Sequence, residues 1–241
     1  MKEQTYKSDF EMFLAHTDEK AVLLNAITAT VQKQKPKSML DIGAGNGLLS
    51  VPLACLVSTY VAVEPHPRFA ETLRDYGLQV VQDYFPTKIN QRFDFILSSH
   101  SINYEQDKFR PFIENAWDLL KPKGTLLIVT YRGQADDWTE LLHKLGKNPE
   151  DKNRLGYNQI VKLLYSLGTL KLRKVVTYVR ASNITEMLLA LSFVASDGEP
   201  EKKAAFLEQK LRLQKLMDTK YQNKEGYFFP FTHYFLETSK T

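Results

Sequence analysis

The pattern of apolar and polar positions divides the chain into a helical beginning, an alternating middle and a mixed end. Residues 6–34 carry apolar side chains at helical spacing, with an interruption at Thr17 and Asp18, either of which can cap a second helix. From residue 37, short apolar runs typical of buried strands alternate with helical patterns. The predicted strands are 38–42, 59–64, 79–82, 93–99 and 125–131, and the predicted helices between them are 48–57, 67–76 and 109–120.

The order of these elements predicts an α/β fold. Successive strand–helix steps favour a parallel sheet with right-handed crossovers and helices on both faces. The segment 121–124, Lys-Pro-Lys-Gly, reads as a stop signal before the fifth strand. Beyond it, helical patterns cover 135–145, 158–167 and 184–220, the last with a break at 197–200, and strand patterns cover 170–179 and 227–236.

Composition and charge narrow the function classes. Hydrophobic residues make up 43% of the chain and aromatic residues 12%, enough for a sizeable core, and the formal net charge is only +4. A local basic excess lies in the predicted helix at 201–225. A solvated helix face explains this stretch better than a nucleic-acid contact, which usually shows a basic stripe.

The single cysteine, Cys55, excludes an internal disulfide and a cysteine–histidine metal cluster around it, and it suits a reducing compartment. The N-terminus lacks the apolar stretch of a signal peptide, and no apolar run approaches the ~20 residues that span a bilayer. We therefore expect a cytoplasmic protein without a bound metal or a membrane contact.

The strongest motif lies where the first predicted strand meets a helix, and it reads Asp41-Ile42-Gly43-Ala44-Gly45-Asn46-Gly47. Glycines let the backbone turn sharply and let a ligand approach the main chain without a Cβ in the way. The helix that follows presents unpaired N–H groups beside such a ligand. Glu64 ends the second strand, where a carboxylate can accept hydrogen bonds from both ribose hydroxyls of an adenosine.

Dinucleotide binding also uses a glycine-rich loop and an acid, but the spacing separates the two cases. The dinucleotide motif G-x-G-x-x-G requires a glycine at position 48, where this chain has Leu48. Asp41 precedes the first glycine, where a carboxylate would repel a pyrophosphate but favours a ligand with a cationic amino group and no phosphate, such as S-adenosylmethionine. A glycine turn without a ligand is the alternative interpretation of the loop, and a solvated strand end that of Glu64.

These motifs resemble the first two motifs of class I S-adenosylmethionine-dependent methyltransferases. Residues 119–131 are similar to that family's passage from a helix into the fifth strand, and Asp83 matches a position that contacts the adenine amino group, although a turn acid is its alternative. The resemblance implies a doubly wound, Rossmann-like, seven-stranded, mostly parallel sheet with the last strand antiparallel, N-terminal helices and a helical cap before the final strand. It also implies S-adenosyl-L-methionine as the cofactor, bound by Asp41, Gly43, Ala44, Gly45, Asn46, Gly47, Glu64, Pro65, Asp83, Tyr84, Ser99 and His100.

Outside this core the chain resembles histamine N-methyltransferases, at 6–19, 63–65, 93–96, 137–138 and 224–226. That resemblance implies an amine substrate held by Glu19 and an aromatic wall that includes Tyr104, with His100 where that family has a cofactor- and substrate-side glutamine. We assign these three residues to catalysis. The family's substrate-binding asparagine falls at about Thr232, and the glycine loop is closer to the general class I pattern, so histamine itself is not implied.

Each substrate-side residue has a structural alternative. Glu19 can equally be an acid in the first turn of a helix, Tyr104 an aromatic at the edge of the core, and His100 a hydrogen-bonded structural histidine. The aromatic residues of 228–231 read more readily as sheet core than as a pocket wall.

We interpret the 241 residues as one methyltransferase domain that acts on a small molecule, at an amine nitrogen. An RNA or protein methyltransferase and a non-catalytic cofactor-binding protein are the alternatives. The DNA amino-methyltransferase signature is absent after the fourth strand, which argues against a nucleic-acid partner, and the oligomeric state stays open, with a monomer allowed. The predicted parts are an N-terminal helical cap (1–36), a cofactor-binding core (37–182), a helical substrate cap (183–225) and a final strand (226–241).

Overall fold

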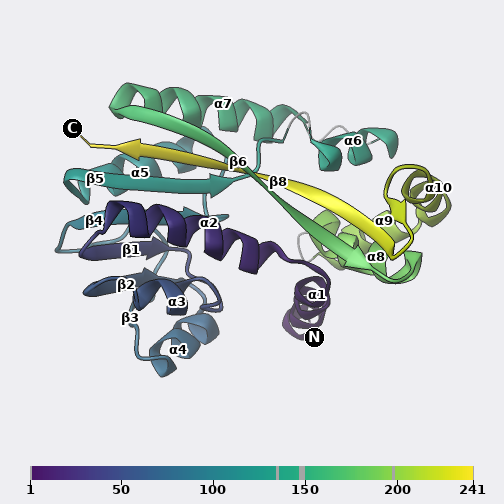
Figure 1. Ribbon diagram of the computed structural model, residues 1–241, viewed down its shortest axis with the longest axis horizontal. Coiled ribbons are helices and arrows are strands. Elements are labelled where there is room, and N and C mark those ends of the chain that lie inside the picture. Colours follow the sequence, from purple (N-terminus) through teal and green to yellow (C-terminus); the bar gives the residue numbers. More distant parts are fainter. Residues whose placement is uncertain (1, 134–135, 147–149, 197–198, 241) are drawn as a thin grey trace. The chain divides into compact units, whose positions relative to one another are not determined.

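The computed structural model describes residues 2–133, 136–146, 150–196 and 199–240, and Figure 1 shows the order of its helices and strands. The chain forms two compact units. The sheet unit comprises residues 23–134, 149–175 and 233–241, and the helical unit comprises residues 1–22, 135–148 and 176–232. The predicted helix start at Ala135 and part of the predicted break, 197–198, lie outside the described residues.

The sheet unit is built on a mostly parallel sheet. The strand order is β3-β2-β1-β4-β5-β8-β6, with the two-residue β7 paired to β8. Strands β1 to β5 pair in parallel, and β8 pairs with β5 in the antiparallel sense. The strands are β1 (Ser38–Ile42), β2 (Thr59–Val63), β3 (Gln79–Val81), β4 (Phe93–Ser99), β5 (Leu120–Thr130), β6 (Thr169–Ala181), β7 (Gln222–Asn223) and β8 (Gly226–Ser239).

Helices cover both faces of this sheet, as a doubly wound fold requires. Apolar side chains of α2, α3 and α4 pack on one face, where Ile27 and Leu127 belong to a single buried cluster. Helices α5 and α7 cover the other face, and Figure 1 shows α2 and α5 on opposite sides of the strands. The helices are α2 (Glu19–Gln34), α3 (Ser50–Ala54), α4 (Pro67–Asp75), α5 (Gln106–Asp118) and α7 (Glu150–Leu167).

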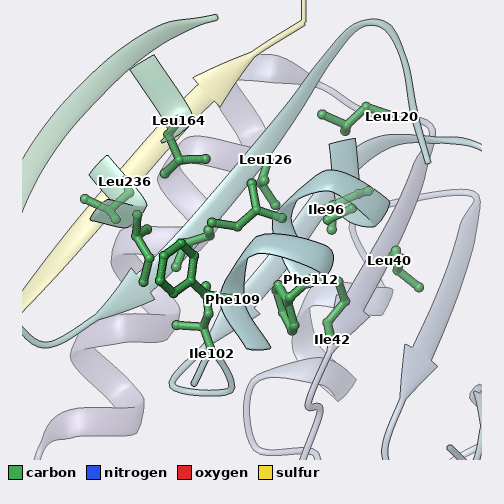
Figure 2. Close-up of a cluster of buried hydrophobic side chains, with 14 of the residues drawn as sticks. Leu40, Ile42, Ile96, Ile102, Phe109, Phe112, Leu120, Leu126, Leu164 and Leu236 are labelled. Atoms are coloured by element: carbon green, nitrogen blue, oxygen red, sulfur yellow. The ribbon is translucent and has the colours of Figure 1, made fainter. Parts of the chain in front are cut away.

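The core under α5 and α7 is the one drawn in Figure 2. Leu40, Ile96 and Leu126 of three neighbouring strands contribute to it, with Phe109 from α5 and Leu164 from α7. All of β1 is buried, as expected for a strand that is covered on both faces. The predicted fold class, an α/β protein with a Rossmann-like sheet and an antiparallel last strand, is confirmed, but within the described residues the sheet has eight strands and not the predicted seven, because the short β7 is added to it.

The helical unit has an aromatic core. Trp138 lies 5.5 Å from Phe231 and 6.1 Å from Phe229 between ring centroids, and Tyr221 lies 4.8 Å from Phe229. Phe229 and Phe231 are buried, so their contacts are those of core residues. The helical stretch predicted at 184–220 forms three helices, because a further break between Leu207 and Lys210 adds to the predicted break before Pro200. The helices are α1 (Lys2–His16), α6 (Asp137–Lys144), α8 (Ile184–Ser196), α9 (Pro200–Leu207) and α10 (Lys210–Lys220).

Two predicted helices differ from those observed. The helix predicted at 48–57 is shorter, because α3 spans only Ser50–Ala54. Gly47 lies in the left-handed region with φ of 84°, and Pro52 has no N–H to donate, so helical hydrogen bonding is confined to a short segment. The helix predicted at 158–167 begins earlier, at Glu150.

The helix α5 ends at Asp118, before the stop signal predicted at 121–124, but the predicted strand start at 125 is wrong, since residues 121–124 belong to β5. Leu120 pairs with Phe93, the register then shifts, and Thr125 pairs with Phe95. Lys123 adopts φ of 64° within this segment. The four residues are therefore an irregularity inside the strand and not a turn that precedes it.

Candidate active site

The loop after β1 takes three residues through the left-handed region. Gly43, Gly45 and Gly47 have φ of 78°, 60° and 84°, which residues with a Cβ rarely adopt. A Cβ on Gly43 would collide with the Ser101 side chain, whereas a Cβ on Gly45 would meet nothing within 4 Å. Gly43 is therefore required by packing, and the backbone at Gly45 faces open space that a ligand can enter.

Glu64 lies directly beside this loop. Its buried carboxylate accepts a hydrogen bond from the Gly45 N–H at 2.7 Å through Oε2 and from the His66 N–H at 2.9 Å through Oε1. Each carboxylate oxygen keeps capacity to accept another hydrogen bond. The acid thus has a fixed position and the acceptor capacity that two ribose hydroxyls require.

Asp41 is buried beneath the loop. Its Oδ2 accepts hydrogen bonds from the Ser50 hydroxyl at 2.6 Å and the Tyr60 hydroxyl at 2.7 Å, so it ties β1 to α3 and β2. Burial and the negative charge of Asp41 raise the pKa of Tyr60 well above its ordinary value, which keeps the hydroxyl a donor. These contacts are structural, and a contact of Asp41 with the cofactor stays a prediction.

Three other predicted cofactor residues lie in or beside the loop. The Ala44 N–H donates to the Val63 carbonyl oxygen at 3.2 Å, and Asn46 Oδ1 accepts from the Leu48 N–H at 3.4 Å. Pro65 follows β2 directly after the acid. These three residues contribute mainly backbone atoms to this edge of the sheet.

The carboxyl end of β4 adjoins the same loop. Ile42 of β1 is paired with Ser98 of β4, and the Ser101 hydroxyl donates to the Ile42 carbonyl oxygen at 2.6 Å. Ser99 carries a buried hydroxyl without a hydrogen-bond partner among the described residues. Buried hydroxyls are normally paired, so Ser99 keeps the capacity to form a hydrogen bond with a ligand atom at this edge. Because the strand order reverses between β1 and β4, this is also the crevice where doubly wound proteins bind their ligands.

His100 follows Ser99 and pairs with a second histidine. Its Nε2 lies 3.0 Å from Nδ1 of His233, and its ring centroid lies 4.4 Å from that of Tyr131. His233 is fully buried, and one imidazole must donate to the other. His233 was not predicted from the sequence. It lies in the last strand, and only the antiparallel pairing of β8 with β5, which places Tyr234 opposite Thr130, brings it to the end of β5.

Tyr104 is joined to the end of β5. Its hydroxyl accepts a hydrogen bond from the Tyr131 N–H at 3.1 Å and lies 2.6 Å from the Tyr131 carbonyl oxygen. The hydroxyl also lies 2.5 Å from Thr130 Oγ1, and the ring packs against the core. These contacts are those of an aromatic residue at the core edge, and a substrate contact of Tyr104 stays a prediction.

Asp83 and Tyr84 lie on the surface after β3. Asp83 accepts hydrogen bonds from the Thr87 hydroxyl at 2.6 Å and the Tyr84 N–H at 2.8 Å, and the bond from Thr87 lowers the pKa of the Asp83 carboxyl. The Tyr84 side chain is 78% exposed. These contacts are those of a turn acid, and the adenine contact stays a prediction.

Glu19 belongs to the helical unit and begins α2. It is 5% exposed, and its N–H donates to Thr17 Oγ1 at 3.1 Å, while the Asp18 carbonyl oxygen accepts from the Val22 N–H at 3.0 Å. The Asp18 carboxylate accepts from the Tyr178 N–H at 2.7 Å. Lys20 Nζ lies 3.0 Å from Glu19 Oε1. A carboxylate this deeply buried is uncommon without a partner or a function.

The chain matches the family described as "Methyltransferase domain" over residues 14–189, and it therefore belongs to that family. It is 30% identical over 138 residues to the mitochondrial ubiquinone biosynthesis O-methyltransferase of Bos taurus. That match covers 49% of this chain and 34% of the relative, so the chain spans about a third of the relative's length.

Two solved structures show the same fold. The YcgJ protein of Bacillus subtilis superposes with a TM-score of 0.62 at 14% identity, over 90% of this chain and 97% of the other. A SAM-dependent methyltransferase of Thermotoga maritima, a candidate histamine N-methyltransferase, superposes with a TM-score of 0.55 at 18% identity, over 98% and 94%. The predicted methyltransferase class is confirmed by the family match, and S-adenosyl-L-methionine is the cofactor that this family implies.

The residues at the β1–β4 edge fit this cofactor. Gly45 offers a backbone without a Cβ that faces open space, Glu64 offers acceptors for the ribose hydroxyls, and Ser99 offers a buried hydroxyl that lacks a partner among the described residues. When bound there, the cofactor supplies an activated methyl group on a sulfonium. The protein has then to bind, orient and desolvate the acceptor, which explains why the sequence shows no catalytic triad.

Proposed function

We propose that this chain transfers a methyl group from S-adenosylmethionine to a small molecule, at an amine nitrogen. The observation that supports methyl transfer best is the open backbone at Gly45 beside the fixed carboxylate of Glu64. The assignment of an amine substrate is supported by Glu19, a buried acid in the segment that resembles histamine N-methyltransferases.

In this proposal the protein positions the acceptor and accepts the proton that the acceptor loses. The new N–CH3 bond forms as the S–CH3 bond breaks, and the methylated nitrogen must lose a proton. Glu19 would orient the amine by charge and accept that proton. His100 and His233 form a second group that can hold a proton at the end of β4.

An oxygen acceptor is the second candidate, because the bovine relative is an O-methyltransferase. The histidine pair could take the proton of a hydroxyl group as the O–CH3 bond forms. This alternative uses the same cofactor residues and changes only the acceptor.

A radiolabelled methyl-transfer screen over small amines, small hydroxyl compounds, total RNA and proteins tests the proposal. We expect label in one or more amines. Label confined to hydroxyl compounds would move the assignment to the second candidate, and label confined to RNA or protein would overturn the small-molecule assignment. Cofactor binding without transfer to any class would indicate a non-catalytic protein.

Replacing Glu19 with glutamine is expected to raise KM for the amine or lower kcat by about tenfold or more, because the amine loses its ionic partner. Affinity for S-adenosylhomocysteine should change less than about twofold. The matched control is Glu11→Gln, which neutralises an exposed acid in the same unit. A collapse of cofactor binding, or equal kinetics in both variants, would show that Glu19 does not bind the substrate.

Replacing His233 with phenylalanine fills the same buried space without a ring nitrogen. If the histidine pair carries a proton, kcat should fall by about 100-fold and the shape of the pH–rate profile should change. A purely packing role predicts a lower melting temperature with an unchanged pH profile, and that result would remove the pair from the mechanism.

Among the described residues, none of the helices is both long and apolar enough to span a membrane. We propose a cytoplasmic location and a small-molecule partner. Fractionation of cells that express the tagged chain tests the location, because the bovine relative is mitochondrial.

A further inference from the structure

The sheet unit carries a pocket on the edge opposite the glycine loop. It is a pocket of about 960 Å³ at the amino ends of β1 and β5, bordered by the end of α2 and the start of β6. We call it the basic pocket. Its charged lining residues include only two acids, Asp94 and Glu237, and six cations, which are Lys33, Lys35, Lys37, Lys123, Lys171 and Arg173.

Both acids of the basic pocket are already engaged. Asp94 Oδ2 accepts hydrogen bonds from the Ser38 N–H and hydroxyl at 2.8 Å each, and Asp94 Oδ1 lies 3.2 Å from Lys121 Nζ. Glu237 Oε1 accepts from Gln34 Nε2 at 3.2 Å and lies 3.7 Å from Lys171 Nζ. These two carboxylates therefore do not neutralise the remaining cations.

Four lysines of the pocket lack an ionic partner. Within the part of the chain that the structure describes, the ammonium groups of Lys33, Lys35, Lys37 and Lys123 form no hydrogen bond or ion pair. By contrast, Arg173 is held in place. Its Nη2 donates to the Ala26 carbonyl oxygen and to Thr30 Oγ1 at 3.2 Å each, and its guanidinium lies 4.3 Å from the centroid of the Phe235 ring.

Ordinary structural roles explain only part of this arrangement. Lysines at the end of α2 complement the helix dipole, which accounts for Lys33 and Lys35. Lys171 lies on an edge strand, where lysine prevents unwanted pairing. Lys37 and Lys123 are exposed residues of two other segments that line the same hollow, so their positive charges add to its attraction for an anion.

We propose that the basic pocket binds a small anion with two or more phosphate groups. A fixed guanidinium and several ammonium groups on long side chains are the donors that phosphates prefer. The hydroxyls of Thr30, Thr125 and Ser239 also line the pocket, and its volume lies within the range of about 300–1,000 Å³ that is usual for ligand sites. S-adenosylmethionine carries no phosphate and its loop follows the carboxyl ends of the strands, so this inference is independent of the proposed methyl transfer.

Calorimetric titration of the full chain with inorganic tripolyphosphate tests the proposal, at about 0.15 M salt so that weak surface attraction is screened. We expect saturable binding of one tripolyphosphate with Kd below about 1 mM. The triple variant Lys33→Glu, Lys37→Glu, Lys123→Glu should bind at least about tenfold more weakly. The matched control is Lys88→Glu, Lys108→Glu, Lys162→Glu, which changes the net charge equally at sites of the same unit outside the pocket.

The control variant should bind as the unchanged protein does, and circular dichroism should show that both variants are folded. Equal losses in the two triple variants, or binding that does not saturate, would reduce the effect to general charge attraction and overturn the proposal. Total RNA and phosphatidylserine vesicles serve as further arms. Binding to either of them without binding to tripolyphosphate would assign the surface to a macromolecular anion instead, and would equally overturn it.

Discussion

Replacing Gly45 with arginine is expected to weaken the binding of S-adenosylhomocysteine by at least about 100-fold while the protein stays folded. Gly45 adopts φ of 60°, and a Cβ there would meet nothing within 4 Å, so the new side chain occupies only the space that we assign to the cofactor. The left-handed backbone costs a residue with a Cβ about 1–2 kcal/mol, which a stable domain tolerates. Isothermal titration calorimetry measures the affinity.

The chain offers a matched control in Gly77→Arg. Gly77 also has positive φ, at 80°, and a Cβ added to it would likewise meet nothing within 4 Å, but it lies in the turn after α4. The same charge and the same backbone strain are therefore introduced at a position outside the glycine loop. If Gly77→Arg lost the cofactor as completely as Gly45→Arg, strain or charge would explain both results, and the loop would not be the binding site.

Replacing Glu64 with glutamine should weaken the binding of S-adenosylhomocysteine by about 10- to 100-fold, because a hydrogen bond to a charged acceptor contributes about 1.5–3 kcal/mol. Glutamine retains an amide oxygen that can accept from the Gly45 N–H or the His66 N–H. Its NH2 group cannot accept from the other N–H, so one of these two hydrogen bonds is lost in the variant. Calorimetry on the two proteins gives the ratio of dissociation constants.

A change of ligand supplies the control for Glu64. An S-adenosylhomocysteine analogue that lacks both ribose hydroxyls should bind the unchanged protein and Glu64→Gln with nearly equal affinity, since the contact is missing in both. If the substitution weakened both ligands by the same factor, Glu64 would act on the loop and not on the sugar.

Sequence patterns predicted the buried strands most reliably. Strands β1 and β4 have the predicted bounds, 38–42 and 93–99, because both are short apolar runs enclosed by the sheet and its helices. The glycine loop was also predictable, because a strand that runs directly into several glycines enters positions where positive φ is allowed, and a tight turn is favoured there. Glu64 was found because its position follows from the end of the second strand.

Contacts that depend on strand register were not predictable. The pairing of His100 with His233 requires β8 to insert beside β5 in the antiparallel sense, and no local pattern near residue 233 indicates that. The irregular start of β5 depends on the pairing of Leu120 with Phe93, which is again a long-range contact. Polar residues whose partners are distant in sequence therefore need the tertiary structure before their roles can be assigned.

The role predicted for Asp41 is incomplete, although the motif to which it belongs was recognised. The sequence placed this acid before the first glycine and connected it with the cofactor's amino group. Its described hydrogen bonds come from Ser50 and Tyr60, neither of which belongs to the motif. Asp41 stabilises the loop through these hydrogen bonds, and the tertiary structure was needed to identify their donors.

We propose that the loop after β1 and the carboxylate of Glu64 bind the adenosyl part of S-adenosylmethionine. Calorimetric titration of the folded, unmodified chain with S-adenosylmethionine and S-adenosylhomocysteine tests it most directly. We predict one binding site, with both ligands bound and with binding lost in Gly45→Arg. A folded chain that bound neither ligand, or that bound both equally well in Gly45→Arg, would contradict the account.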